Sequence, residues 1–345
     1  MTESWSRGLR RMPDAVWFPA AGVAEIRTEP PQPVGLTDVR VRAVVSGLSA
    51  GSELLVYRGL APSDLPPDLP TVDGDFRLPI KFGYASVGTV VEVGAEVAGL
   101  EVDDVVFAHH PHQTEYVVPA EFPIRLPKGL PVERGVFAAN LETAATVVLD
   151  SHHRLGEAVL VVGQGIVGLL VTMLLKRAGA RPVIAVDLHE RRRAAAVRAG
   201  ADSALGPGDR LVPQVMELTG GRGVDVAVEA SGSPAALQSC VDTAAFGGTV
   251  VVASWYGTRD VTLALGGAFH RRRLRLVSSQ VSTLDPTLSR RWSRERRTDL
   301  VRTLLTELPL EDLISHRFPF SAAASAYELL ETKPEECLQV VLDYV

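Results

Sequence analysis

The sequence has little cysteine and no long apolar run. Cys240 and Cys337 are its two cysteines in 345 residues, and they lie far apart. That spacing excludes a disulfide framework and a cysteine-rich zinc ribbon. Apolar runs such as 158–162 and 249–253 are much shorter than the roughly 20 residues that cross a bilayer. The first seven residues also lack the apolar core of a signal peptide, so we expect a cytoplasmic protein without membrane contact.

An excess of positive charge is missing as well. The chain carries 35 Lys and Arg against 41 Asp and Glu, a net charge of −6, and its pI is about 5.8. This balance favours neither nucleic acid nor an anionic membrane as a partner. Arginines gather at 271–275 and 290–297, but Trp292 is the only aromatic residue among them, too few for stacking on bases. We therefore interpret both clusters as solvated surface and predict a small-molecule partner.

Length and composition fit two globular domains. The first 130 residues are predicted to be β-rich, because 39–45 alternates as a half-buried strand does, and 88–93 and 104–107 are short strands between turn residues. From Glu157 on, strands and helices alternate, starting with the apolar run 158–162, which is typical of a parallel strand buried on both faces. The predicted fold class is therefore α/β, with a doubly wound parallel sheet in the second part. Further predicted strands are 183–186, 224–229, 249–253, 274–277 and 337–345, and predicted helices are 166–178, 190–199, 211–218, 234–245, 286–308 and 322–331.

A proline-rich segment interrupts the β-rich part between residues 60 and 79. It contains five prolines, which exclude a regular helix. Its length exceeds the usual connection between elements, so we predict a functional surface loop, with a bland linker as the alternative.

The strongest motif is a G-x-G-x-x-G pattern that follows the buried strand 158–162 and opens a helix. In such a motif the first glycine allows a tight turn, the second lets a pyrophosphate approach the backbone, and the third lets helix and strand pack closely. The helix N-terminus then offers free N–H groups to the phosphates. The motif predicts a dinucleotide site; the alternative is a tight turn that binds no ligand. Its residues are Gly163, Gln164, Gly165, Ile166, Val167 and Gly168.

An acidic residue stands where the adenosine ribose of a dinucleotide is bound. Asp187 follows Gly168 by nineteen residues, ends the predicted strand 183–186 and is followed by Leu188. A carboxylate there accepts hydrogen bonds from the ribose hydroxyls and repels a 2′-phosphate, so NAD(H) is favoured over NADP(H). Arg191, Arg192 and Arg193 complicate this prediction, because one of them could bind a 2′-phosphate. They could equally form a solvated helix start.

Four segments together carry a resemblance to a known family: 46–53, 82–94, 161–168 and 228–233. Over nearly its whole length the chain resembles the medium-chain dehydrogenase/reductase, or alcohol dehydrogenase, superfamily. The resemblance implies a GroES-like β-rich catalytic domain over 1–145, a Rossmann NAD-binding domain over 146–283, and a C-terminal segment, 284–345, that returns to the first domain. Tyr84 and the stretch 140–143 look closer to the bacteriochlorophyllide-dehydrogenase-like branch than to liver-type enzymes.

The resemblance also implies further contacts. Cofactor contacts are expected after three strands of the second domain. A homodimer is expected through the edge strand 274–281, because association covers an unpaired strand edge. The implied cofactor contacts are Ala230, Ser231, Trp255 and Ser279.

The zinc ligands of the family are largely missing. Ala50 takes the place of the ligand cysteine, Tyr84 takes the place of the ligand histidine, and only Glu142 resembles the ligand glutamate of polyol-type members. A catalytic zinc needs about three protein ligands, so we predict no zinc. A loop with His109, His110 and His112 leaves a residual metal hypothesis, with polar surface histidines as the alternative.

Without zinc, another group must donate a proton to the oxygen on which negative charge develops. Ser52 matches the hydroxyl of the family's proton relay, while Leu55 replaces the histidine at the relay's exit. Tyr84 is predicted to point into the cleft, with aromatic packing as the alternative. His112 is a candidate proton donor or substrate contact, because histidine titrates near neutral pH.

These features predict a zinc-independent, NAD(H)-dependent oxidoreductase that interconverts a carbonyl and an alcohol on a small or medium metabolite. Two alternatives stay open. One is reduction of an activated C=C bond, and the other is a dinucleotide-binding protein without catalysis.

Overall fold

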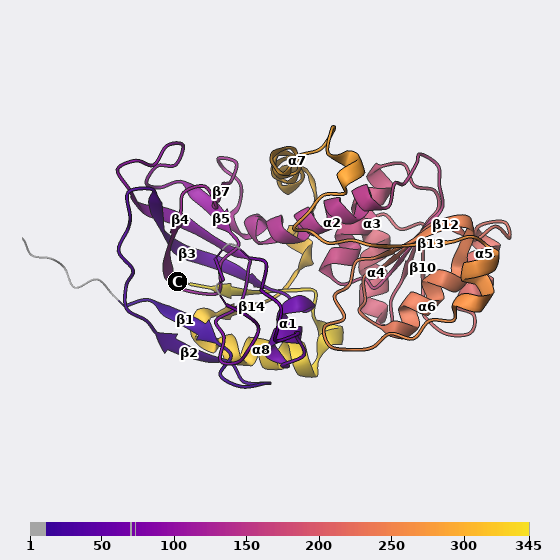
Figure 1. Cartoon of the computed structure of the whole chain (residues 1–345), viewed down its shortest axis with the longest axis horizontal. Helices are drawn as coiled ribbons and strands as arrows, with labels where there is room; N and C mark the ends of the chain where they lie inside the picture. The colour runs from indigo at the N-terminus through magenta and orange to yellow at the C-terminus, as the bar shows by residue number, and fades with distance from the viewer. Residues whose placement is uncertain (1–11, 70, 73, 345) are drawn as a thin grey trace, which may run out of the picture.

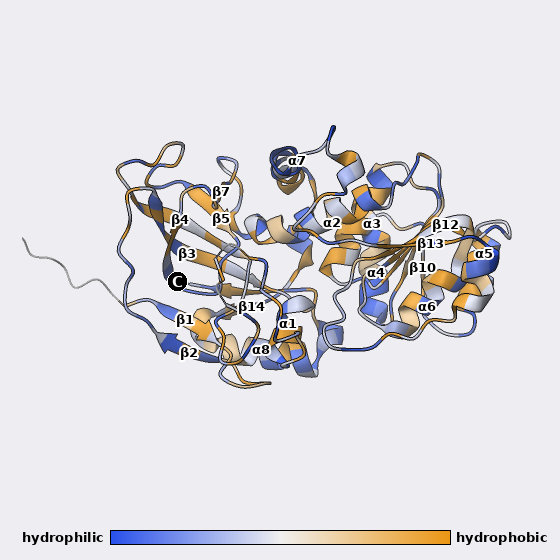
Figure 2. Ribbon diagram, viewed as in Figure 1, coloured by the Kyte–Doolittle hydropathy of each residue, from blue (hydrophilic) through white to orange (hydrophobic). Residues whose placement is uncertain are grey.

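The computed structural model describes residues 12–69, 71–72 and 74–344. The N-terminal residues on which the signal-peptide prediction rests lie outside this range. A β-rich part and an α/β part lie side by side along the long axis of the molecule (Figure 1). Apolar residues concentrate on the strands of both sheets (Figure 2). Within the described ranges, no helix is long and apolar enough to cross a membrane.

The β-rich part is built on a seven-stranded sheet. Its order is β14 (Ile314–Pro319), β15 (Gln339–Asp343), β3, β4, β5 and β7, and β6 also pairs with β3. The predicted strands 88–93 and 104–107 are present as β4 and β5. The predicted strand 39–45 is the centre of β3, but it is more buried than an alternating pattern implies, because Arg40 is only 4% exposed and bonds Glu92 at 2.9 Å. A separate two-stranded sheet pairs β1 (Asp14–Trp17) with β2 (Glu25–Thr28). The other strands of this part are β3 (Asp38–Leu48), β4 (Ser86–Val93), β5 (Val105–Ala108), β6 (Glu115–Pro119) and β7 (Ile124–Arg125).

The α/β part contains a six-stranded parallel sheet of order β10-β9-β8-β11-β12-β13. The order reverses between β8 and β11, which is where a doubly wound sheet opens a crevice for a ligand at the carboxyl ends of its strands. The short strand β10 was not predicted. The strands are β8 (Val159–Val162), β9 (Val183–Val186), β10 (Ser203–Leu205), β11 (Val224–Glu229), β12 (Ala244–Val252) and β13 (Arg275–Ser278).

The helices largely follow the predicted alternation, with two additions. The sequence did not predict α1 or α2, although α2 is thirteen residues long and packs between the two parts. The helices are α1 (Ser52–Tyr57), α2 (Ala138–Asp150), α3 (Ile166–Arg177), α4 (Glu190–Arg198), α5 (Leu211–Leu218), α6 (Pro234–Thr243), α7 (Arg294–Glu307) and α8 (Ala323–Thr332).

The C-terminal segment returns to the β-rich sheet. Its strand β15 (Gln339–Asp343) pairs antiparallel with β3 and parallel with β14 (Ile314–Pro319). The single helix predicted over 286–308 is wrong. A short turn, Pro286–Leu288, comes first, and α7 begins only after Ser293, whose extended backbone and side chain cap the helix through the N–H of Arg296.

The proline-rich segment 60–79 contains no regular helix or strand among its described residues. Phe76 is buried in it, and its ring lies 5.2 Å from that of Trp255, which follows β12. The amide of Gln280 also reaches Asp68 at 3.3 Å. The loop therefore lies against the carboxyl ends of β12 and β13.

Candidate active site

The glycine-rich turn leaves space where a dinucleotide phosphate would lie. Gly163 has φ +93°, and a Cβ there would come within 2.7 Å of the Ala230 and Ser231 backbone. A Cβ on Gly168 would lie 1.8 Å from the carbonyl oxygen of Gly163, so β8 and α3 can pack only around glycine. At Gly165, which caps α3, a Cβ would meet nothing within 4 Å. The open space faces the free N–H groups of α3, beginning with Ile166 and Val167, and these residues fit a pyrophosphate.

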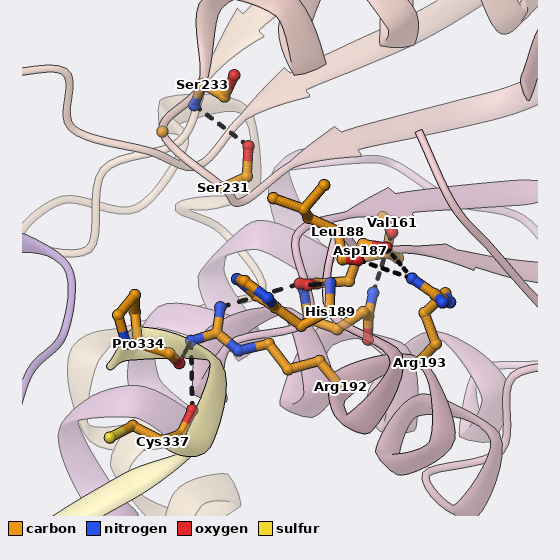
Figure 3. A network of polar contacts seen from close by, with 12 residues as sticks. Val161, Asp187, Leu188, His189, Arg192, Arg193, Ser231, Ser233, Pro334 and Cys337 are labelled. Carbon is orange, nitrogen blue, oxygen red and sulfur yellow. Dashed lines mark hydrogen bonds and ion pairs between the residues drawn. The ribbon is translucent and has the colours of Figure 1, made fainter. Parts of the chain in front are cut away.

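Asp187 is buried at the end of β9 with both carboxylate oxygens accepting hydrogen bonds (Figure 3). The N–H of Gln164 donates to it at 2.7 Å and the N–H of His189 at 2.8 Å. The carboxylate is thereby tied to the glycine-rich turn. The next residue, Leu188, is 71% exposed beside it. This arrangement fits a ribose whose hydroxyls approach Asp187 from the open side.

The three arginines of α4 bind backbone carbonyls rather than forming a free, solvated helix start. Arg193 donates to the carbonyls of Asp187 and Leu188 at 2.9 and 2.8 Å. Arg192 donates to the carbonyl of Pro334 at 2.6 Å, and Arg191 to that of Glu336 at 2.9 Å. Figure 3 shows Arg192 reaching from α4 to the C-terminal segment. Arg191 and Arg192 therefore connect the α/β part to residues 334–337.

A buried glutamate shapes the turn after β11. Glu229 accepts hydrogen bonds from the N–H and hydroxyl of Ser231 at 2.7 and 2.6 Å, and from the N–H of Gly232 at 2.9 Å. Its other oxygen accepts from the Tyr256 hydroxyl at 2.8 Å. Ala230 and Ser231 are thus held beside Gly163. Sequence reasoning missed Glu229, although its place at a strand end, like that of Asp187, was an available signal.

Two further residues expected at the cofactor lie at the carboxyl ends of β12 and β13. The Ser279 hydroxyl donates to Asp150 at 2.6 Å, and burial raises the pKa of that carboxyl. Trp255 is half-buried against Phe76 of the proline-rich loop. Ser279 therefore contacts α2, and Trp255 contacts the β-rich part.

Ser52 and Tyr84 come together at the start of α1. The two hydroxyl oxygens are 2.9 Å apart. Burial raises the pKa of Tyr84, hydrogen bonds from Ser49 and Ser52 oppose this, and the charge of Glu53 adds to it. Tyr84 is thus protonated at neutral pH and able to donate.

The three histidines of the loop after β5 have different surroundings. His112 is fully buried, with Nδ1 2.7 Å from the Ser46 hydroxyl and Nε2 3.0 Å from Glu53. Neither nitrogen is free, so this geometry does not support a substrate contact. His110 is also buried, where burial lowers its pKa to about 3. His109 is partly exposed, and its Nε2 lies 3.0 Å from Glu142.

The residues at the family's zinc position do not fit a catalytic zinc. Ala50 offers no ligand atom, and the phenol of Tyr84 is bonded to Ser52. Glu142 lies 3.7 Å from the guanidinium of Arg297, whose charge would repel a dication. Burial raises the pKa of Glu142, but the hydrogen bond from His109 and the nearby cations hold it below its usual value. Across the described residues, no group of three or more His, Cys, Asp or Glu side chains could hold a metal ion.

Known proteins share this architecture. A family model described as zinc-binding dehydrogenase matches residues 167–294. D-guloside 3-dehydrogenase of Escherichia coli (strain K12) is 29% identical over 325 residues, covering 88% of this chain and 92% of the relative. (R,R)-butanediol dehydrogenase of Bacillus subtilis (strain 168) is 33% identical over 263 residues, covering 68% of this chain and 73% of the relative. The chain belongs to the medium-chain zinc-binding dehydrogenase superfamily.

The fold of this dehydrogenase agrees with that assignment. The crystal structure of 2R,3R-butanediol dehydrogenase from Bacillus subtilis matches it with a TM-score of 0.81 at 21% identity, covering 96% of this chain and 100% of the other. The predicted α/β class, with a β-rich part and a parallel Rossmann sheet, is confirmed. The protein is an NAD(P)-dependent medium-chain dehydrogenase.

Proposed function

We propose that this dehydrogenase is zinc-independent and interconverts a secondary alcohol and a ketone on a small or medium polyhydroxylated metabolite, with NAD(H) as its cofactor. The observation that carries the proposal is the hydrogen-bonded pair of Ser52 and Tyr84, which offers a proton donor at the family's metal position. The substrate class is supported by the relatives, whose names describe the oxidation of a D-guloside and of butanediol. Ala50 and Tyr84 at the ligand positions, together with the stretch 140–143, support a place in a zinc-deficient branch similar to bacteriochlorophyllide dehydrogenases.

The proposed chemistry divides between cofactor and protein. When bound, the nicotinamide supplies the hydride chemistry. In carbonyl reduction, the Tyr84 hydroxyl donates its proton to the oxygen that gains negative charge, and the Ser52 hydroxyl hydrogen-bonds to the phenol. In alcohol oxidation the proton moves the opposite way. Ser52 and Tyr84 are thus the proposed catalytic residues, and no step requires a metal.

The preference for NAD(H) rests on Asp187. Its carboxylate is fixed by two backbone N–H groups, those of Gln164 and His189, and cannot turn away from a 2′-phosphate without losing both bonds. The side chains of Arg191 and Arg192 bind carbonyls of the C-terminal segment. Arg193 bonds the carbonyls of Asp187 and Leu188, and Arg192 also places Nη1 4.0 Å from the Asp187 carboxylate.

The test is a turnover panel with the purified protein. Polyols, sugar glycosides and vicinal diols are offered with NAD⁺ or NADP⁺, and ketones and enones with the reduced cofactors. We expect secondary alcohols to be oxidised with NAD⁺ in the presence of a chelator. Turnover of enones alone would indicate C=C reduction, and tight NADH binding without any turnover would indicate a non-catalytic dinucleotide-binding protein.

A further inference from the structure

A largely buried polar network adjoins the segments that carry Ser52 and Tyr84. At its centre, His112 Nε2 is 3.0 Å from Glu53 Oε1, and both side chains have no exposed surface. The Tyr327 hydroxyl of α8 donates to the same carboxylate oxygen. On the other side of the imidazole, Nδ1 is 2.7 Å from the Ser46 hydroxyl, which lies 2.9 Å from the hydroxyl of Tyr344. The network joins β3, α1, the loop after β5 and the C-terminal segment.

Glu53 fixes the chain segment that carries the Ser52 hydroxyl, and His112 fixes the segment that carries the Tyr84 hydroxyl. Glu53 is the residue after Ser52, and its Oε2 accepts from the backbone N–H of Ser49 at 3.3 Å. His112 packs against Gly83, the residue before Tyr84. A Cβ on Gly83 would come within 2.7 Å of His112 Nε2, and Gly83 has φ +139°, so glycine allows this close approach.

The cost of burying Glu53 argues that the network has a purpose other than stability. A carboxylate without solvent is expensive unless it is fully hydrogen-bonded, and here Tyr327, His112 and the Ser49 N–H provide three donors. Even a well-paired buried ion pair is seldom more stable than apolar residues of the same volume. A network of this kind does, however, restrict the geometry of the segments that it joins.

We propose that Glu53 and His112 are positioning residues that hold the Tyr84 hydroxyl against the Ser52 hydroxyl for proton transfer, and that Tyr327 completes this support from the C-terminal segment. The inference rests on the proposed function, because it assigns Tyr84 as the proton donor. It also gives His112 a role other than the proton donor or substrate contact predicted from sequence.

The first experiment is a double-mutant cycle in steady-state kinetics, with the best alcohol from the panel. Misplacing a reacting group by about 1 Å costs up to roughly 100-fold in rate, so we expect Glu53→Gln and His112→Asn to lower kcat by about 10- to 100-fold. KM and the Kd for NADH should change by less than about twofold. In a Tyr84→Phe background, Glu53→Gln should lower kcat by less than about twofold more, because it acts through Tyr84. An equal loss in both backgrounds would overturn the proposal.

Two additional variants separate positioning from misfolding. His110→Asn is the matched control, because His110 is a buried histidine in the same loop whose ring stacks on Tyr116 and does not contact Glu53. It should leave kcat within about twofold of the wild type, since it has no part in the proposed support. Tyr327→Phe removes one hydroxyl from the network without changing its shape and replaces Glu53→Gln if that variant does not fold. It should show the same loss of kcat and the same dependence on Tyr84.

A second measurement does not depend on turnover. With 3-fluorotyrosine introduced at position 84, the ¹⁹F resonance reports the surroundings of the phenol. We expect Glu53→Gln, His112→Asn and Tyr327→Phe to shift or broaden it, and His110→Asn to leave it unchanged. An unaltered resonance in the first three variants would overturn the proposal. If no alcohol is oxidised but the resonance responds, the positioning of Tyr84 stands and the proposed reaction fails.

Discussion

The hydroxyl oxygens of Ser52 and Tyr84 lie 2.9 Å apart, although 32 positions separate the residues in the chain. One belongs to the start of α1 and the other precedes β4. In the proposed reaction, this contact orients the Tyr84 hydroxyl as the proton donor.

Replacing Tyr84 tests this donor directly. Loss of one well-placed donor costs about 10²–10³ in rate, so we expect Tyr84→Phe to lower kcat by that factor and to leave the Kd for NADH unchanged. Ser52→Ala should have a smaller effect, since it removes a hydrogen bond to the donor but not the donor itself. Stopped-flow measurement of hydride transfer distinguishes the chemical step from product release. Full activity of both variants would mean that the proton comes from water.

The proposed preference for NAD(H) depends on the charge of Asp187. We expect the wild type to bind NADH more tightly than NADPH. Asp187→Asn should reduce the ratio of the Kd for NADPH to the Kd for NADH by about tenfold, or ~1.4 kcal/mol, because the repulsion of the 2′-phosphate is removed. Fluorescence titration measures both affinities. Glu190→Gln is the control, because it removes an exposed negative charge three residues further on. Tighter NADPH binding by the wild type would instead assign a 2′-phosphate contact to the arginines of α4.

Zinc content tests the proposed independence from metal. Protein purified without a histidine tag should contain no stoichiometric zinc by elemental analysis, and its activity should survive a chelator, because Ala50, Tyr84 and the ion-paired Glu142 make a poor zinc site. About one zinc per chain would contradict this. His109 and Glu142 would then be the first ligands to examine.

The buried His110 predicts how stability depends on pH. Its pKa is about 3 in the folded protein against an ordinary value of 6.5. Between pH 6.5 and pH 3, His110 is therefore protonated in the unfolded chain but neutral in the folded chain. Stability therefore falls as pH drops from 6.5 toward 3, by about 2 kcal/mol at pH 5 from this group alone. Urea unfolding at pH 7 and pH 5 measures the loss. His110→Asn should reduce the difference between the two pH values, and an unchanged difference would show that His110 does not cause it.

We propose that two copies pair through β13, the last strand in the order of the parallel sheet. Leu276 of this strand is 41% exposed, and an unpaired apolar edge favours association. Light scattering should give twice the chain mass of 37.0 kDa. Leu276→Asp should shift the protein toward the monomer, whereas Val102→Asp, at a residue 54% exposed in the β-rich part, should not. A wild-type monomer at all concentrations would reject the proposed dimer.

Local features of the sequence were sufficient to predict the dinucleotide-binding fold. The glycine-rich turn, the buried strand before it and Asp187 lie within 30 residues. The turn depends on the small size of glycine, and the strand depends on a single continuous apolar run. The start of α7 after Ser293 is also set locally. A single serine cap within an arginine-rich stretch is, however, a weak indication of where a helix begins. The unpredicted α2 lacks one clear apolar face, because it is buried on several sides by α3 and α7.

The arrangement of the catalytic candidates was decided by tertiary packing. The sequence alone gives no reason to distinguish His109, His110 and His112. In the structure, the first is partly exposed beside Glu142, the second is stacked on Tyr116, and the third is buried against Glu53. The orientation of these side chains depends on their partners from β3, α2 and the C-terminal segment. The spacing of the histidines in the sequence does not predict those partners. The sequence by itself determined the glycine-rich turn and the replacement of the family's cysteine and histidine ligands by Ala50 and Tyr84. Long-range contacts decided that Ser52 and Tyr84 meet, because the pairing of β3 with β4 brings together the segments that follow β3 and precede β4, and that His112 lies against Glu53.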